Sequence, residues 1–308
     1  VTGEVNTSIR PEWFYHKKED GKVKTLPDLM EIYYNSIGRN GTLLLNFPIM
    51  PNGLIHKTDS TNVIEFAHAV KKAFAVNLAE GASAEASNVR GNDSRFAAGK
   101  SIANNNETYW ATEDNLTSGS LTINFRRPTA FNRFLIQEYI PLGQRVKSFS
   151  LEAFANGKWN PVATATTIGY KRILRFNTVT ATKLRVNIID AKSCPLISNI
   201  EIFNAPQILA PPSIVRERNG DIIITPKDFE SQLYYTLDGR DPDKKSTRYT
   251  KPIKTTDGKA EVRSIAYDPV TKKYSPIQQE KYDISRANWK LVGIDDKNAY
   301  NLLDGNTD

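Results

Sequence analysis

The stretch "SLTINFRRPTAFNRFLIQEYI", residues 120–140, decides the fold class of the central part of this chain. In its first six residues apolar and polar side chains alternate, with Leu121, Ile123 and Phe125 on one side. This period of two is typical of a β-strand with one buried face. The second half, "RFLIQEYI" (133–140), is another short β-rich run, and no helical periodicity connects the two.

The same texture extends over residues 82–205. Further short runs recur at regular spacing: "SFSLEAF" (148–154), "ILRF" (173–176), "KLRVNII" (183–189) and "NIEIF" (199–203). "NGKW" (156–159) is a hairpin turn signal. Regularly spaced short strands predict an antiparallel sandwich or barrel for this region.

Residues 1–79 have a different texture. "TLPDLMEIYYNSIG" (25–38) has apolar residues at helical spacing, and Gly38 suits the end of that helix. The short apolar run Leu43–Phe47 predicts a buried strand, and the amphipathic stretch at 60–81 predicts a second helix. We expect one part of a parallel α/β domain, whose remaining strands would precede residue 1.

After the proline-rich linker "NAPQILAPPS" (204–213), residues 208–284 predict a small β-sandwich. Its strand candidates are "DIIITP", "QLYYTLDG", "AEVRSIAYD" and "QQEKYDI". The last piece, 287–308, is too short to fold alone. We expect it to begin a further module.

Composition excludes several classes of protein. The net charge is +7, but the 41 Lys and Arg residues are scattered, which indicates solvated surface charge and not a nucleic-acid partner. No apolar run of about 18 residues occurs, so we expect no membrane span. The single cysteine, Cys194, allows no intrachain disulfide, which suits a cytosolic or an exported protein. Motifs for zinc, phosphate loops and serine nucleophiles are absent from the sequence.

One carboxylate is followed by polar and aromatic residues that are typical of a sugar pocket. Glu4 precedes Arg10, Trp13, Tyr15 and His16. Aromatic rings stack on sugars while a carboxylic acid protonates the glycosidic oxygen, and a retaining glycosidase needs a second carboxylate roughly 5–5.5 Å away. On composition alone, a solvated acid before a loop of packing aromatics is the better interpretation.

"EVNTSIRPEWFYH" (4–16) and "LMEIYYNSIGRNGTLLLNFPIMPNGLIH" (29–56) resemble the end of the catalytic barrel of the glycoside hydrolase family 29 α-L-fucosidases. The resemblance implies a truncated (β/α)8-type barrel and retaining, exo-acting hydrolysis of α-1,3- or α-1,4-linked fucose without a cofactor. It implies that Glu4 is the general acid/base, that Arg10, Trp13, Tyr15 and His16 bind substrate, and that an aspartate nucleophile lies upstream of Val1. The chain alone would then be inactive. Glu12 departs from the family, which has glycine there.

The β-rich regions resemble accessory modules. "SNVRGNDSRF" (87–96) and "ETYWAT" (107–112) resemble a discoidin, or factor 5/8 C-terminal-type, jelly roll. That resemblance implies a structural calcium at Asn105, Thr108 and Glu201, although asparagine at 105 replaces the usual aspartate and removes a charge that calcium favours. "YYTLDGRDPDKKSTRYTKPI" (234–253) resembles the Ig-like sandwich at chitobiase C-termini, and residues 287–308 resemble the start of a second discoidin module.

The sequence therefore predicts a multidomain protein, a barrel end followed by all-β sandwiches. Its function would be that of the C-terminal portion of an α-L-fucosidase, with a fucosylated oligosaccharide or glycoconjugate as partner and a periplasmic or extracellular location. The alternatives are an array of non-catalytic carbohydrate-binding modules and a purely structural role for the discoidin module.

Overall fold

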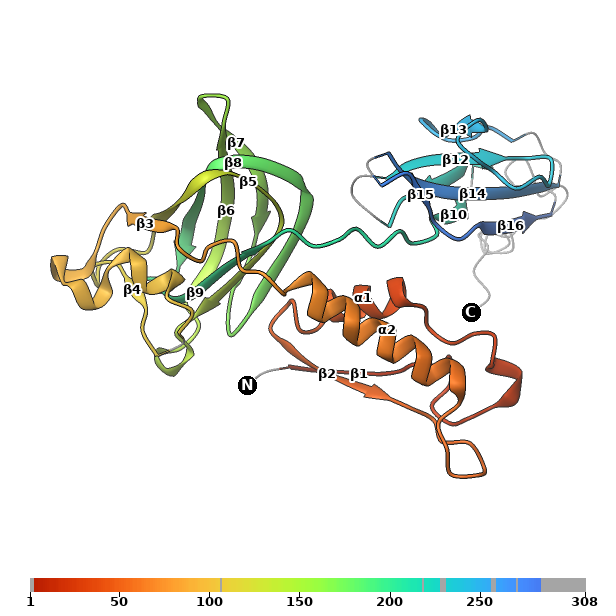
Figure 1. Ribbon diagram of the computed structural model, residues 1–308, viewed down its shortest axis with the longest axis horizontal. Helices are drawn as coiled ribbons and strands as arrows, with labels where there is room; N and C mark the ends of the chain where they lie inside the picture. Colours follow the sequence, from red (N-terminus) through yellow and green to blue (C-terminus); the bar gives the residue numbers. More distant parts are fainter. Residues whose placement is uncertain are drawn as a thin grey trace, which may run out of the picture. The chain divides into compact units, whose positions relative to one another are not determined.

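The computed structural model describes residues 3–105, 107–217, 219–227, 231–255, 259–269 and 271–283. The chain forms two compact units, Val1–Pro206 and Gln207–Asp308 (Figure 1). The expected start of a further module, 287–308, lies outside the described residues.

The first unit opens with a small α/β segment. Strands β1 (Gly3–Ser8) and β2 (Gly41–Asn46) pair in parallel, and helices α1 (Leu26–Asn35) and α2 (Lys57–Ala73) lie beside them (Figure 1). The apolar core of this segment is formed by Ile9, Val23 and Leu29, with Leu45, Phe47, Val63 and Phe66 packed against it. The parallel pairing confirms the α/β character that the sequence predicted, while a closed barrel stays a prediction.

Two details of this segment differ from the sequence-based expectation. Strand β1 was not predicted, because five of its six residues, "GEVNTS", are polar or glycine and only Val5 is apolar. The run Leu43–Phe47 was expected to be buried on both faces, yet Leu44 is 49% exposed. Successive side chains of β2 therefore point alternately to an uncovered face and to a face that packs against the core of the segment.

Local sequence fixes both ends of α1. Thr25 and Asp28 form a capping box, in which the Asp28 carboxylate accepts the Thr25 backbone N–H at 3.0 Å, and a proline stands in the first turn. Beyond the helix, a Cβ atom at Gly38 would stand 2.5 Å from the carbonyl oxygen of Tyr34, so glycine is required there. The predicted helix and its glycine stop are confirmed.

The rest of the first unit is a β-sandwich built on one seven-stranded sheet with the order β4-β9-β5-β8-β6-β7, in which β3 pairs with β5. Its strands are β3 (Ser83–Ala86), β4 (Trp110–Ala111), β5 (Gly119–Glu138), β6 (Val146–Ala155), β7 (Lys158–Ala165), β8 (Arg172–Ala191) and β9 (Leu196–Phe203). Short 3₁₀ helices are η1 (Lys17–Glu19), η2 (Arg90–Asn92), η3 (Ser94–Phe96), η4 (Ala98–Ile102) and η5 (Ile140–Leu142). Strands predicted as separate runs are continuous: β5 and β8 each span 20 residues and shift register between Asn124 and Thr129. Such irregularities bend a strand, which lets one strand serve both layers.

The alternation in the sequence correctly predicted which side chains form the sandwich core. Leu121, Ile123, Phe131 and Phe149 are fully buried in it, and Phe125 packs against it. The predicted hairpin joins β6 to β7 through Asn156 and Gly157, both of which have positive φ angles (55° and 76°). Positive φ at both turn residues is the geometry that this turn type demands.

The second unit is a smaller all-β structure. Its strands are β10 (Ser213–Arg216), β11 (Ile222–Thr225), β12 (Gln232–Thr236), β13 (Thr247–Arg248), β14 (Ala260–Asp268), β15 (Lys273–Tyr274) and β16 (Gln278–Tyr282). Strands β10 and β11 pair with each other, and the other five form a second antiparallel sheet. The apolar core comprises Ile214, Ile222, Ile224, Leu233, Ile253, Val262 and Ala266. The sandwich predicted over 208–284 is thus observed in the described residues.

Candidate active site

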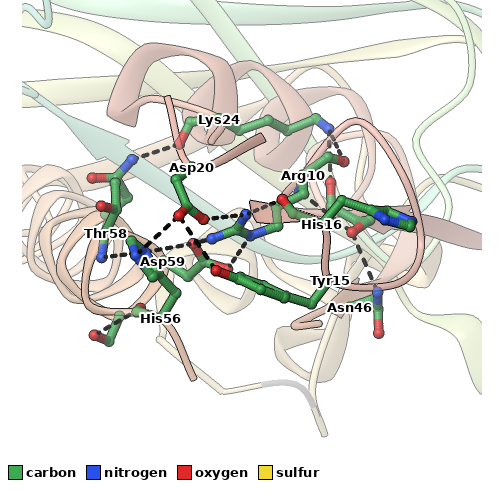
Figure 2. Close-up of polar contacts among 12 residues, drawn as sticks. Arg10, Tyr15, His16, Asp20, Lys24, Asn46, His56, Thr58 and Asp59 are labelled. Carbon is green, nitrogen blue, oxygen red and sulfur yellow. Dashed lines mark hydrogen bonds and ion pairs between the residues drawn. The ribbon is translucent and has the colours of Figure 1, made fainter. Parts of the chain in front are cut away.

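The loop that follows β1 is built around one buried arginine, Arg10 (Figure 2). Its Nε and Nη2 atoms donate to the two carboxylate oxygens of Asp59 at 2.8 Å each, and its Nη1 donates to Asp20 at 3.0 Å. Both Arg10 and Asp59 are completely buried. The paired donors match the carboxylate geometry, so this arginine joins the end of β1 to the first turn of α2.

A tyrosine and a histidine complete this frame. The Tyr15 hydroxyl donates to Asp20 at 3.3 Å, and the Arg10 guanidinium lies 4.7 Å from the centre of the Tyr15 ring. His56 Nε2 lies 3.6 Å from the second oxygen of Asp20, while its Nδ1 accepts the Thr58 backbone N–H at 3.3 Å and so caps α2. Figure 2 shows these side chains converging on Asp20.

The frame shifts the pKa values of its members. Burial alone would raise the pKa of Asp20, but the Arg10 hydrogen bond, the charge of His56 and the Tyr15 hydrogen bond together lower it. The hydrogen bond to Asp59 raises the pKa of Arg10 against the effect of burial. Burial, followed by the hydrogen bond to Asp20, raises the pKa of Tyr15. The cluster therefore holds Arg10 charged and Asp20 ionised, which is the state of a structural ion pair and not of a proton donor.

Arg10 consequently has a different role from the substrate contact that was expected. A fully buried guanidinium with two carboxylate partners has no free face for a sugar. Tyr15 likewise belongs to the frame through its hydroxyl and its ring. The resemblance could not reveal this, because the partner Asp59 lies 49 residues away in the sequence.

Trp13 and His16 remain accessible on the same loop. Trp13 is 45% exposed, and its carbonyl oxygen accepts a hydrogen bond of 2.8 Å from Asn46 at the end of β2. His16 Nε2 lies 3.1 Å from Glu12, and both side chains are about half exposed. The loop backbone is thus pinned at both strand ends while these two side chains face outward, which suits residues that contact a ligand.

Glu4 is not brought together with these residues. It is exposed and lies at the second position of β1, opposite Thr42 of β2. Four residues of extended chain separate it from Ser8 at the carboxyl end, a distance of about 13 Å. The loop with Trp13 and His16 begins only beyond Ser8. Glu4 therefore lies before the carboxyl end of β1, and its role as the general acid stays a prediction.

The α/β segment is fastened to the sandwich through Tyr34 of α1. Arg133 of β5 donates from Nε to the Tyr34 hydroxyl at 3.0 Å, and the Arg175 guanidinium of β8 lies 4.4 Å from the ring centre. Arg175 also binds Glu31, one turn earlier on α1, at 2.6 Å. The contact is polar and aromatic, and it spans about 100 to 144 residues of sequence separation. It holds α1 against the sandwich. Since α1 packs into the core of the α/β segment, it also holds β1 and β2 there.

The three residues expected to bind calcium do not present free ligands together. The Asn105 side-chain oxygen accepts the Glu107 backbone N–H at 2.7 Å, and Glu201 accepts from Asn199 at 2.6 Å. Burial, then Tyr34, then the charge of Glu201 raise the pKa of Tyr33 to about 12, so Glu201 faces α1. The buried hydroxyl of Thr108 has no hydrogen-bond partner. Among the described residues no group of three His, Cys, Asp or Glu side chains could hold a metal. A calcium ion at Asn105, Thr108 and Glu201 stays a prediction.

Comparison with known families places both β regions in accessory-module families. Residues 82–202 match the F5/8 type C domain, and residues 222–282 match the family described as Fn3 associated. These matches agree with the two resemblances drawn from the sequence, and the first covers nearly the whole sandwich of the first unit.

Proteins that are similar to a larger part of this chain are described as α-L-fucosidases. Alpha-L-fucosidase 1 of Arabidopsis thaliana is 38% identical over 207 residues, which are 66% of this chain and 40% of the relative. A family 29 fucosidase of Ruminococcus gnavus solved in complex with fucose is 35% identical, with a TM-score of 0.62 over 66% of this chain and 41% of that one. A glycoside hydrolase 29 family member from an unknown rumen bacterium is 32% identical, with a TM-score of 0.56 over 92% of this chain and 50% of that one.

The chain spans about 40% of the length of the curated relatives that it matches. In the described part of the chain, no helix combines the length and the apolar character needed to cross a membrane.

Proposed function

We propose that this chain is the C-terminal portion of a retaining, exo-acting α-L-fucosidase, which releases terminal α-linked L-fucose from glycans. The observation that carries the proposal is the similarity to fucosidases over about two thirds of the chain. The parallel pair β1–β2 with its two helices suits the last part of a (β/α)8 barrel, whose active site lies at the carboxyl ends of the strands.

In this proposal the loop after β1 forms part of the rim of the fucose site. Trp13 and His16 are accessible at the carboxyl end of β1 and are the substrate contacts that we carry forward. Arg10, Asp20 and Asp59 hold the loop in one conformation, so that the rim is already ordered when the sugar arrives. Such preorganisation lowers the entropic cost of binding.

The assignment of the general acid is revised on geometric grounds. Catalytic residues of these barrels lie at the carboxyl ends of the strands, whereas Glu4 lies about 13 Å before that end of β1. This position argues against Glu4 as the acid/base. We propose that both carboxylates of the retaining mechanism, the nucleophilic aspartate and the acid/base, belong to other parts of the complete enzyme.

The F5/8 type C domain acts in this proposal as a brace for the barrel. The Tyr34 contacts support that role, because they occupy one part of the sandwich with intramolecular partners. The location that we propose is periplasmic or extracellular, which suits a module family that is typical of extracellular proteins and a partner that is a fucosylated oligosaccharide or glycoconjugate.

The test compares the complete protein with the 308-residue chain on fucosyllactose, with the released sugar followed by proton NMR. We expect the complete protein to release fucose first as the α-anomer, the product of retention, and the 308-residue chain to release none. Release of the β-anomer first would exclude the retaining mechanism. Failure of the complete protein to release fucose would overturn the fucosidase proposal.

A further inference from the structure

One face of the larger sheet in the second unit carries a cluster of tyrosines. Side chains alternate along β12 and β14, and Leu233 and Val262 point into the core. Tyr234 and Tyr267 therefore stand on the opposite face. Tyr274 of β15 pairs directly with Tyr267 and so shares that face. We call Tyr234, Tyr267 and Tyr274 the tyrosine platform.

The platform is compact and accessible. The rings of Tyr234 and Tyr267 meet edge to face at 6.2 Å, and those of Tyr267 and Tyr274 lie 4.9 Å apart. Tyr274 is 44% exposed. Ile265, which pairs with Tyr234 on the same face, is 2% exposed. The three rings therefore form one continuous aromatic row across β12, β14 and β15.

An amide and several charged side chains border the rings. Gln232 pairs with Tyr267 across the sheet, and its side-chain oxygen accepts the Tyr234 hydroxyl at 3.0 Å. The adjoining charges largely neutralise one another, since Arg263 binds Asp241 at 2.5 Å and Lys281 binds Glu261 at 3.3 Å. Arg248 stands opposite Tyr234 on β13 as an exposed donor at the edge. The centre of the platform is thus aromatic, hydroxylated and without formal charge.

The size of the platform selects the kind of ligand. A whole aromatic side chain contributes about 150–250 Å² when buried, so three partly exposed rings offer roughly 300 Å². A stable protein partner needs about 800 Å² on each side. The platform is therefore too small for a protein interface but large enough for one or two sugar rings. Phenol rings flanked by an amide complement the apolar face and the hydroxyl groups of a neutral saccharide.

We propose that the tyrosine platform of the second unit is a binding site for neutral oligosaccharides. It lies in the Fn3-associated region, outside the segment assigned to catalysis. Binding there would hold the protein on a glycan while another part of the molecule acts on it. The proposal does not require the chain to be active, so it can fail or hold independently of the fucosidase assignment.

The experiment measures saturation-transfer NMR of the 308-residue chain with lactose and with fucosyllactose as probes. We expect transfer from the protein to the sugar ring protons, with weak affinity. Tyr274→Ala and Tyr267→Ala should each weaken binding about fivefold, because one aromatic contact of this kind changes the dissociation constant by roughly five- to tenfold. Tyr274→Phe should retain most of the binding, since it keeps the ring.

Tyr170→Ala is the matched control, because Tyr170 is 53% exposed in the first unit. It should leave binding unchanged, and thermal melts should show that each variant folds. Absence of transfer to either sugar would overturn the proposal. Equal binding by Tyr274→Ala and the unsubstituted chain would do the same. A dimer that Tyr274→Ala converts into a monomer would show that a second copy occupies the platform instead.

Discussion

The guanidinium of Arg10 binds the carboxylate of Asp59 through two hydrogen bonds of 2.8 Å, and both side chains are completely buried. This pair joins the end of β1 to the first turn of α2, across 49 residues of sequence. Because a buried charge is costly without its partner, the pair makes the loop after β1 depend on the helix that follows β2.

We expect Asp59→Asn to destabilise the α/β segment strongly. The substitution leaves the Arg10 charge buried with only Asp20 beside it, and loss of one partner from a buried pair costs about 3–5 kcal/mol. Chemical denaturation of the 308-residue chain should show the loss, and amide hydrogen exchange should place it in residues 10–24. Glu12→Gln is the control, because it removes only solvent-exposed pairs with His16 and Lys18. An equal effect of both substitutions would contradict the framing role of Arg10.

Tyr34 should be the residue on which the contact between α1 and the sandwich most depends. Its side chain is 5% exposed, and replacement of a buried aromatic by alanine costs about 3–5 kcal/mol. Tyr34→Ala should therefore increase proteolysis within residues 26–46 while the sandwich stays protected. Tyr34→Phe removes only the acceptor for Arg133 and should cost about 1 kcal/mol. Uniform loss of protection across the first unit would show that the two parts unfold together.

Glu138 should make stability fall as the pH rises. It is 3% exposed, its Oε1 accepts the N–H groups of Arg145 and Val146, and its Oε2 accepts that of Gly169. Burial raises its pKa even though these hydrogen bonds lower it. The folded protein then keeps the proton to a higher pH than the unfolded chain does. Stability from this group is present below the usual glutamate pKa and is lost as the pH rises through the raised one.

Denaturation at several pH values should detect this contribution by comparison with Glu138→Gln, which does not titrate. The stability of the unsubstituted chain relative to the variant should be greatest at low pH and should decrease above the usual glutamate pKa. Near neutral pH the variant should still be less stable by about 1–3 kcal/mol, because its amide NH₂ faces a backbone donor. A difference independent of pH would show that Glu138 does not titrate in this range.

Glu4→Gln in the complete protein tests where the general acid lies. Loss of a general acid slows the hydrolysis of natural fucosides about 10²–10⁴-fold. It scarcely changes the hydrolysis of substrates that carry a good leaving group. From the position of Glu4 on β1 we expect small and equal changes on fucosyllactose and on an aryl fucoside. A large loss confined to fucosyllactose would restore Glu4 to the acid/base role that the sequence resemblance implies.

Local patterns in the sequence predicted much of the secondary structure. Alternation in "SLTINF" placed Leu121 and Ile123 in the sandwich core, helical spacing of apolar residues over 25–38 predicted α1, and Asn156–Gly157 marked the hairpin. Strand β1 was missed because it is short and largely polar. It exists because β2 supplies its hydrogen bonds in parallel, which no spacing within β1 could indicate.

The sequence by itself determined the class of each region, because periodicity, caps and turn residues act between near neighbours. Only the tertiary structure decided the roles of the side chains near the candidate site. Arg10 is buried in an ion pair because the carboxylates of Asp59 and Asp20 bind it. Glu4 lies near the start of β1, before the strand end at which the loop begins. Tyr34 became a fastening point through arginines about 100 and 140 residues away. Such partners are selected by packing in three dimensions, where distance along the chain carries no information.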